Sequence, residues 1–315
     1  MSAPLSGGTL RFGSVSGTML ARVSVLVCGL VTGIATARAL GPEGRGQYFA
    51  VTTVAAIIAQ AANLGLSSSN VFLGARDHAR IRPLLANSIA LALVLALVGV
   101  GAVGLWGAAA GRLVGVPPDM LRTAAVIGAA ALLWTLATSL LVATERFAAL
   151  NLWQVVNALA AVAAIVACTV RHASPAQFAL ALALAATLCA VALAAFIAAG
   201  AAGPLRASFA LVREGVGFAA RAYLALLFGY LLQRTGASLL VATSTAAELG
   251  QYSIASQVFD VLLIVPGSIS LVLYPLLVRR QDDLWHHVRR TAILTTVSML
   301  VLCALAAVAA PVVLP

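Results

Sequence analysis

The sequence contains no lysine and few charged residues of either sign. Nineteen arginines and nine acidic residues make up 9% of the 315 residues, whereas charged side chains make up about 25% of a typical globular domain. So few charges cannot cover the surface of a water-soluble fold of this length. Hydrophobic residues account for 62% of the chain, and the mean hydropathy is +1.06. This composition excludes a soluble enzyme and a nucleic-acid-binding domain, and it predicts a membrane protein.

Metal-binding and disulfide patterns are also missing. The four cysteines lie singly inside apolar stretches, and no histidine stands at metal-ligand spacing from another ligand. Free cysteine in such surroundings behaves as a small buried hydrophobic residue. We therefore expect no metal site and no cofactor. The cysteines are Cys28, Cys168, Cys189 and Cys303.

The apolar residues are gathered in long runs. A transmembrane helix needs about 20 apolar residues to cross a hydrocarbon core about 30 Å thick. The alternating pattern of a transmembrane β-barrel does not occur. The runs predict an all-α membrane protein, a polytopic bundle of about nine transmembrane helices. The expected spans are 14–38, 46–68, 84–107, 121–143, 151–170, 176–199, 217–241, 250–277 and 291–311.

Arginine is concentrated in alternate connections between these spans. With the N-terminus inside, eleven arginines fall in cytoplasmic segments, and four or five fall in the opposite connections. Basic residues are retained on the cytoplasmic side of a membrane, so the sequence predicts a multi-pass protein with a cytoplasmic N-terminus. The eleven are Arg11, Arg76, Arg80, Arg82, Arg146, Arg206, Arg213, Arg279, Arg280, Arg289 and Arg290, and the opposite set is Arg38, Arg45, Arg112, Arg171 and, at the edge of a span, Arg122.

A tripeptide is repeated at equivalent places in the chain. Gly46-Gln47-Tyr48 opens the second expected span, and Gly250-Gln251-Tyr252 opens the eighth, 204 residues later. Six helices separate the copies, and an even number preserves the orientation, so the repeat is predicted to be parallel. Residues 1–205 would form a first six-helix lobe, and residues 206–315 would form part of a second lobe with three helices. The chain would then be a fragment, or a partner chain would supply the missing helices.

Ionisable residues inside the spans are the first candidates for a functional site, because a charge at mid-helix costs at least about 2.5–3.5 kcal/mol. Arg22 lies about nine residues, or roughly 13 Å, from the cytoplasmic end of its span. Arg221 lies closer to that end, where it could snorkel to the headgroups or serve the function. Arg234 and Asp260 share a depth of roughly 14 Å. They are either an ion pair, or Arg234 faces an anionic substrate while Asp260 positions it or exchanges protons.

Uncharged polar residues also occur inside the spans. We expect Gln60, Asn63, Gln154 and Asn157 to join neighbouring helices by hydrogen bonds. The intramembrane arginines have hardly any acid nearby, which predicts a cavity that prefers anions, such as a lipid-linked diphosphate. The arginine-rich loops would attract anionic membrane lipids. A membrane glycosyltransferase would need a large loop or paired catalytic acids. No loop exceeds about twenty residues, and the pair Asp282-Asp283 is flanked by four arginines with no second acidic cluster, so we expect a protein that is not an enzyme.

The first hairpin resembles that of a known family. Residues 17–22 and residues 37–48, which read Ala-Arg-Ala-Leu-Gly-Pro-Glu-Gly-Arg-Gly-Gln-Tyr, are similar to the first hairpin of the polysaccharide-biosynthesis (Wzx-type) oligosaccharide flippases of the MOP superfamily. The later segments similar to that family's seventh and eighth helices are Leu231 to Arg234, Ala247 to Ser253, and Pro266-Gly267 before Tyr274-Pro275.

This resemblance implies two lobes that face a central cavity, alternating access, and export of an undecaprenyl-diphosphate-linked oligosaccharide, such as a polysaccharide or O-antigen precursor, across the bacterial cytoplasmic membrane. It places Arg22, Arg221 and Arg234 in a cationic cavity. Many members carry an acidic residue two positions after the arginine that matches Arg234, where this chain has Gly236. A glycan polymerase or other assembly proteins would be partners.

Two alternatives to the flippase stay open. One is a drug/cation antiporter of the same superfamily, which should carry acidic residues in its cavity. The other is a non-transporting fragment or scaffold in a glycan-assembly complex.

Overall fold

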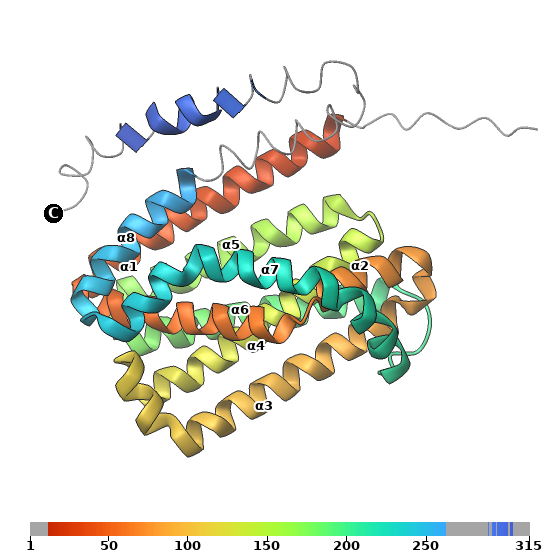
Figure 1. The fold of residues 1–315 in the computed structure, drawn as a ribbon, viewed down its shortest axis with the longest axis horizontal. Helices are drawn as coiled ribbons and strands as arrows, with labels where there is room; N and C mark the ends of the chain where they lie inside the picture. Colours follow the sequence, from red (N-terminus) through yellow and green to blue (C-terminus); the bar gives the residue numbers. More distant parts are fainter. Residues whose placement is uncertain (1–11, 263–288, 290–291, 294, 302, 305–315) are drawn as a thin grey trace, which may run out of the picture. The chain divides into compact units, whose positions relative to one another are not determined.

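The structure is a computed structural model that describes residues 12–262, 289, 292–293, 295–301 and 303–304. Every regular element in these residues is a helix (Figure 1), which confirms the all-α prediction. The chain divides into two compact units, Met1–Ser253 and Ile254–Pro315, and each is described by itself. The helices are α1 (Phe12–Asn63), α2 (Leu66–Arg76), α3 (Ile81–Val114), α4 (Pro118–Ala143), α5 (Phe147–Val170), α6 (Pro175–Gly200), α7 (Phe209–Thr243) and α8 (Ala246–Leu262), with a short 3-10 helix at His78–Arg80.

The described helices have the length and surface of membrane spans. Apolar side chains form a stripe along α6 with the spacing of one helical face, and they are exposed. They are Leu180, Leu184, Leu188 and Val191. Five described stretches are long and apolar enough to cross a membrane: Gly17–Asn63, His78–Arg112, Pro118–Ala143, Phe147–Val170 and Pro175–Gly200. The protein is therefore a multi-pass helical membrane protein.

Helix α1 is a pair of helices joined by a sharp break. Its 52 residues would measure about 78 Å if straight, far more than a hydrocarbon core of about 30 Å. Gly41 has φ 65° and ψ 179°, a conformation that favours glycine, and Pro42 follows as the first residue of the second half. Figure 1 shows the chain reversing direction at this break. The two halves fit the expected spans 14–38 and 46–68.

The second half of α1 ends earlier than the expected span 46–68. Leu64 and Gly65 both have positive φ, 46° and 74°, and α2 begins after them. The polar residues Asn63, Ser67 and Ser68 stand at this break, but the expected span was extended across them to residue 68. A Cβ on Gly65 would lie 2.8 Å from the carbonyl oxygen of Ala219 on α7, so only glycine allows this approach.

Side chains replace the backbone hydrogen bonds that the break removes. The Asn63 amide oxygen accepts from the Ser67 backbone N–H at 3.2 Å, and its nitrogen donates to the Ser67 hydroxyl at 3.1 Å. The Tyr223 hydroxyl of α7 donates to the carbonyl oxygen of Ala61 at 2.9 Å. Unsatisfied backbone groups are costly inside a membrane, so these bonds make the break tolerable. Asn63 therefore caps the start of α2 and joins it to α1, as expected of a polar residue that links neighbouring helices.

The remaining expected spans lie inside longer helices. Helices α3 to α7 contain 84–107, 121–143, 151–170, 176–199 and 217–241, respectively. The expected spans 250–277 and 291–311 run beyond the described residues. The lobe boundary at 205/206 stays a prediction.

Helix α4 is the centre of the first unit. It packs against α1, α2, α3 and α6, and its small residues allow close contact, since a Cβ on Gly128 would lie 2.9 Å from the Ala55 carbonyl oxygen. Two buried apolar clusters lie along it. One includes Val51, Met120, Ala124 and Ala179. The other includes Leu73, Leu85, Leu140, Leu141 and Leu193.

Polar contacts tie α7 to the connection between α2 and α3. Nη1 of Arg80 donates to both carboxylate oxygens of Glu214, each at 3.1 Å. Asn87 of α3 and Ser208 exchange two hydrogen bonds, at 2.8 and 3.0 Å. We call this part of the bundle the arginine-rich end.

The two copies of the repeated tripeptide meet in the structure. A Cβ on Gly46 would overlap the carbonyl oxygen of Ala246, and a Cβ on Gly250 would overlap the carbonyl oxygen of Pro42. Both pairs are related by the repeat offset of 204 residues. The contact is therefore reciprocal, as in an isologous interface between two copies of one unit. The contact places both copies at the same end of the bundle, as a parallel repeat requires.

We call the segments Pro42–Gly46 and Ala246–Gly250 the helix-start pair. Helix α8 begins with a capping box, in which the Thr245 backbone N–H donates to the Glu248 carboxylate at 2.9 Å and the Glu248 N–H donates to the Thr245 hydroxyl at 3.3 Å. The backbone hydrogen bond lowers the pKa of Glu248. A lowered folded pKa means that this cap stabilises α8 above the unfolded pKa and is lost as the pH falls through the folded pKa.

Candidate functional site

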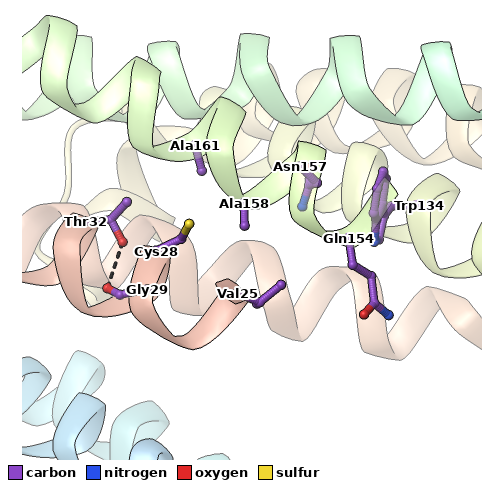
Figure 2. A pocket seen from close by; sticks show the side chains of 9 residues that line it. All are labelled: Val25, Cys28, Gly29, Thr32, Trp134, Gln154, Asn157, Ala158 and Ala161. Carbon is purple, nitrogen blue, oxygen red and sulfur yellow. Dashed lines mark hydrogen bonds between the residues drawn. The ribbon is translucent and has the colours of Figure 1, made fainter. Parts of the chain in front are cut away.

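A pocket lies between α1, α4 and α5 within the first unit. Its volume is about 410 Å³, which falls in the range of roughly 300–1,000 Å³ that small-molecule sites occupy. Figure 2 shows Trp134 and Gln154 towards one end of this pocket and Cys28 and Thr32 towards the other. The lining residues are Val25, Cys28, Gly29 and Thr32 of α1, Trp134 of α4, and Gln154, Asn157, Ala158 and Ala161 of α5.

The pocket exists because small residues stand where α1 faces α5. A Cβ on Gly29 would meet no atom within 4 Å, so this glycine opens onto empty space. Ala158 and Ala161 line the opposite wall. Nearer the N-terminal ends of both helices, the Asn151 amide donates to the Thr18 hydroxyl at 3.0 Å and joins α5 to α1. The helices are thus held together beside the pocket and leave a space within it.

Two amides in the pocket have no partner among the residues that the structure describes. The Thr32 hydroxyl donates to the Gly29 carbonyl oxygen at 2.9 Å. Gln154 and Asn157 line the pocket, and neither amide hydrogen-bonds to any described residue. The expectation that these two side chains join neighbouring helices was therefore wrong. Their spacing from Asn151, at steps of three residues along α5, was the sequence signal that they share one face.

The described residues that line the pocket are uncharged. They include no aspartate, glutamate, arginine or histidine. Elsewhere in the part of the chain that the structure describes, no group of three or more potential metal ligands lies together. The pocket offers an indole, two amides and a hydroxyl, which bind ligands by stacking and by neutral hydrogen bonds.

Arg22 lies just outside this pocket on the same helix face. It precedes Val25 by three residues and Gly29 by seven, and residues at these spacings share a face of a helix. Its side chain is exposed, and it forms no ion pair with any described residue. Arg22 therefore continues the wall of the pocket towards the N-terminus as a cation without a compensating acid among those residues.

The other predicted site residues are placed less completely. Arg234 lies on α7, is half-buried, and its side chain hydrogen-bonds to Tyr230 one turn earlier. Arg221 lies on α7 and Asp260 on α8, but the side chains of both are outside the described residues. Neither Arg22 nor Arg234 is among the described residues that line the pocket. Their roles, and the pairing of Arg234 with Asp260, stay predictions.

The sequence reading missed a buried arginine beside the helix-start pair. Arg45 was expected in a solvent-facing connection, yet it is only 6% exposed. Its Nε donates to the Ser253 hydroxyl at 2.9 Å, its Nη1 donates to the Gly33 carbonyl oxygen at 2.7 Å, and Nη1 also donates to the Thr36 hydroxyl. Arg45 thus joins both halves of α1 to the start of α8. No local pattern distinguishes it from exposed Arg38 on the same helix.

Comparison with known proteins agrees with this fold and composition. The family model described as polysaccharide biosynthesis protein matches residues 14–281. The solved structure of the MATE multidrug transporter DinF-BH, determined in complex with a ligand, superposes with a TM-score of 0.70 at 14% sequence identity, covering 98% of this chain and 76% of that one. No curated protein matches the sequence. The family match spans most of the chain and the fold is that of a MOP-superfamily transporter, so the chain belongs to the polysaccharide biosynthesis protein family.

Proposed function

We propose that this chain carries an undecaprenyl-diphosphate-linked oligosaccharide across the bacterial cytoplasmic membrane by alternating access, with its N-terminus in the cytoplasm. The observation that carries the proposal is Arg22, an exposed arginine inside a membrane helix with no acid paired to it among the described residues. An unpaired charge is costly at this depth, so it is retained where it serves a ligand. Guanidinium groups bind phosphate oxygens through two parallel hydrogen bonds, and a diphosphate offers that geometry.

The alternative is drug/cation antiport, which the likeness to the multidrug transporter supports through its fold. A cationic substrate would need a negative charge in its site. The described lining residues of the pocket include no acid, and the charge nearest to them along α1 is the positive one of Arg22. These observations favour a substrate that carries a negatively charged group and is otherwise uncharged.

Replacing Arg22 by alanine should weaken binding of undecaprenyl diphosphate by roughly 10- to 100-fold, because a charge-assisted hydrogen bond contributes about 1.5–3 kcal/mol. Lysine should restore only part of the affinity, since it keeps the charge but loses the planar fork. Binding is measured with the purified chain in lipid nanodiscs, and export of lipid-linked glycan is measured in cells. Arg38→Ala, which removes an exposed arginine of the same helix, is the matched control and should change neither quantity.

Tetraphenylphosphonium, a lipophilic cation, serves as a second probe in the same binding experiment. If the parent chain binds this cation but not undecaprenyl diphosphate, the antiporter alternative is correct and the proposal is wrong. If both lipid affinity and export survive Arg22→Ala, Arg22 has a structural role only.

The orientation has its own test. Reporter fusions that are active only outside the cytoplasm should be silent at residues 77–80, between α2 and α3, and active at residues 244–245, between α7 and α8. The arginine-rich end is retained inside because basic connections resist translocation. The opposite pattern of activity would reverse the proposed topology.

A further inference from the structure

We propose that the pocket between α1, α4 and α5 is the subsite for an uncharged sugar ring of the lipid-linked cargo. The inference rests on the proposed function and names the part of the cargo that the pocket takes. Trp134 would stack on the ring, and the amides of Gln154 and Asn157 would hydrogen-bond its hydroxyls. Arg22 would hold the diphosphate beside it.

The chemistry of the lining selects a neutral ligand with many hydroxyls. No acidic or basic side chain is among the described residues that line the pocket, so these residues would compensate neither a free cation nor a phosphate. A side-chain amide both donates and accepts hydrogen bonds, as a sugar hydroxyl does. A sugar ring also has an apolar C–H face, which suits the flat face of an indole. The pocket thus offers amides to the hydroxyls of a sugar ring and an indole to its apolar face.

The unpaired amides are a second sign of a ligand. Gln154 and Asn157 stand on a helix that is long and apolar enough to span a membrane, yet no described residue satisfies their hydrogen bonds. Side-chain amides on transmembrane helices normally pair with polar groups of neighbouring helices. Here the neighbouring α1 supplies glycine and small residues in place of partners. A bound hydroxylated ring would satisfy both amides.

The position of Arg22 fits the order of groups in the cargo. Along α1, Arg22 precedes Val25, the first lining residue, by three residues, or roughly 4.5 Å of helix. In a lipid-linked glycan the first sugar is bonded directly to the diphosphate. A diphosphate bound at Arg22 would therefore deliver that sugar to the pocket and leave the lipid chain in the bilayer.

The test compares two probes on the purified full chain in lipid nanodiscs. One probe is undecaprenyl diphosphate that carries a single N-acetylhexosamine, and the other is undecaprenyl diphosphate alone. The parent chain should bind the sugar-bearing probe more tightly. Gln154→Met and Asn157→Leu keep the side-chain size and remove the amides. Each should weaken sugar-probe binding roughly threefold to tenfold, as expected for one neutral hydrogen bond, and leave binding of the bare lipid within about twofold.

A pocket-filling variant and a matched control complete the design. Gly29→Leu places a side chain in open space, so the protein should melt at the parental temperature or above while losing its preference for the sugar probe. Gln60→Met removes an intramembrane amide that does not line the pocket and should alter neither affinity. A conserved melting temperature separates loss of the subsite from loss of folding.

The outcomes separate this inference from the proposed function. If the parent binds both probes equally and Gly29→Leu changes nothing, the sugar subsite does not exist, although an effect of Arg22→Ala on both probes would keep the flippase proposal. If neither probe binds, the proposed function fails first. If Gly29→Leu is the only variant with an effect, and it lowers the affinity for both probes equally, the pocket binds part of the lipid and the inference is wrong.

Discussion

Valine in place of Gly46 should force the helix-start pair apart and strongly destabilise the protein. A Cβ at this position would overlap the carbonyl oxygen of Ala246, which is backbone and cannot rotate away. Overpacking a close contact costs about 1–3 kcal/mol and more when backbone must shift. The change is measured as the fall in thermal melting temperature of the purified protein in detergent.

The repeat supplies a matched variant. Gly250→Val should have an effect of similar size, because its Cβ would overlap the carbonyl oxygen of Pro42 in the equivalent contact. Gly101→Val is the control, since the same substitution on α3 meets no atom within 4 Å. If both helix-start variants have the same melting temperature as the Gly101→Val control, the reciprocal contact contributes nothing to stability. If only one of them is destabilised, the two halves of the contact are not equivalent.

Removal of the Arg45 guanidinium should produce the second large effect. Arg45→Met fills a similar volume but leaves the Ser253 hydroxyl, the Thr36 hydroxyl and the Gly33 carbonyl oxygen without their shared donor. A buried polar group that loses its partner costs about 1–3 kcal/mol. The melting temperature should fall, and Ser253→Ala, which removes a single hydrogen bond of this network, should cause a smaller fall.

Arg38→Met is the control for this experiment, because Arg38 is exposed on the same helix. Equal melting temperatures for Arg45→Met and Arg38→Met would show that the buried network does not hold the two segments together. An effect of Arg45→Met on transport without an effect on melting would instead place Arg45 in the conformational cycle.

The sequence predicted the membrane class, the helices that contain most of the expected spans and the equivalence of the two tripeptides. These properties follow from local signals. An apolar run of sufficient length specifies a spanning helix because lipid offers no partner for the backbone. Pro42, which follows Gly41, marks the reversal in α1, because a proline cannot continue the preceding helix. By contrast, the break at Leu64 and Gly65 depends on two residues with positive φ and on the close approach of Gly65 to α7, which the length of an apolar run does not specify.

Only the tertiary structure decided which polar residues share a site. Asn63 caps a broken helix, Gln154 and Asn157 line a pocket, and Arg45 is buried, although all four looked alike as polar positions beside or within apolar runs. The decisive contacts join distant parts of the chain. Arg45 and Ser253 are 208 residues apart, and Thr18 and Asn151 are 133 apart. Hydrophobic periodicity specifies the face of a helix but not the neighbour that covers it, so the pocket arises from packing that no local pattern contains.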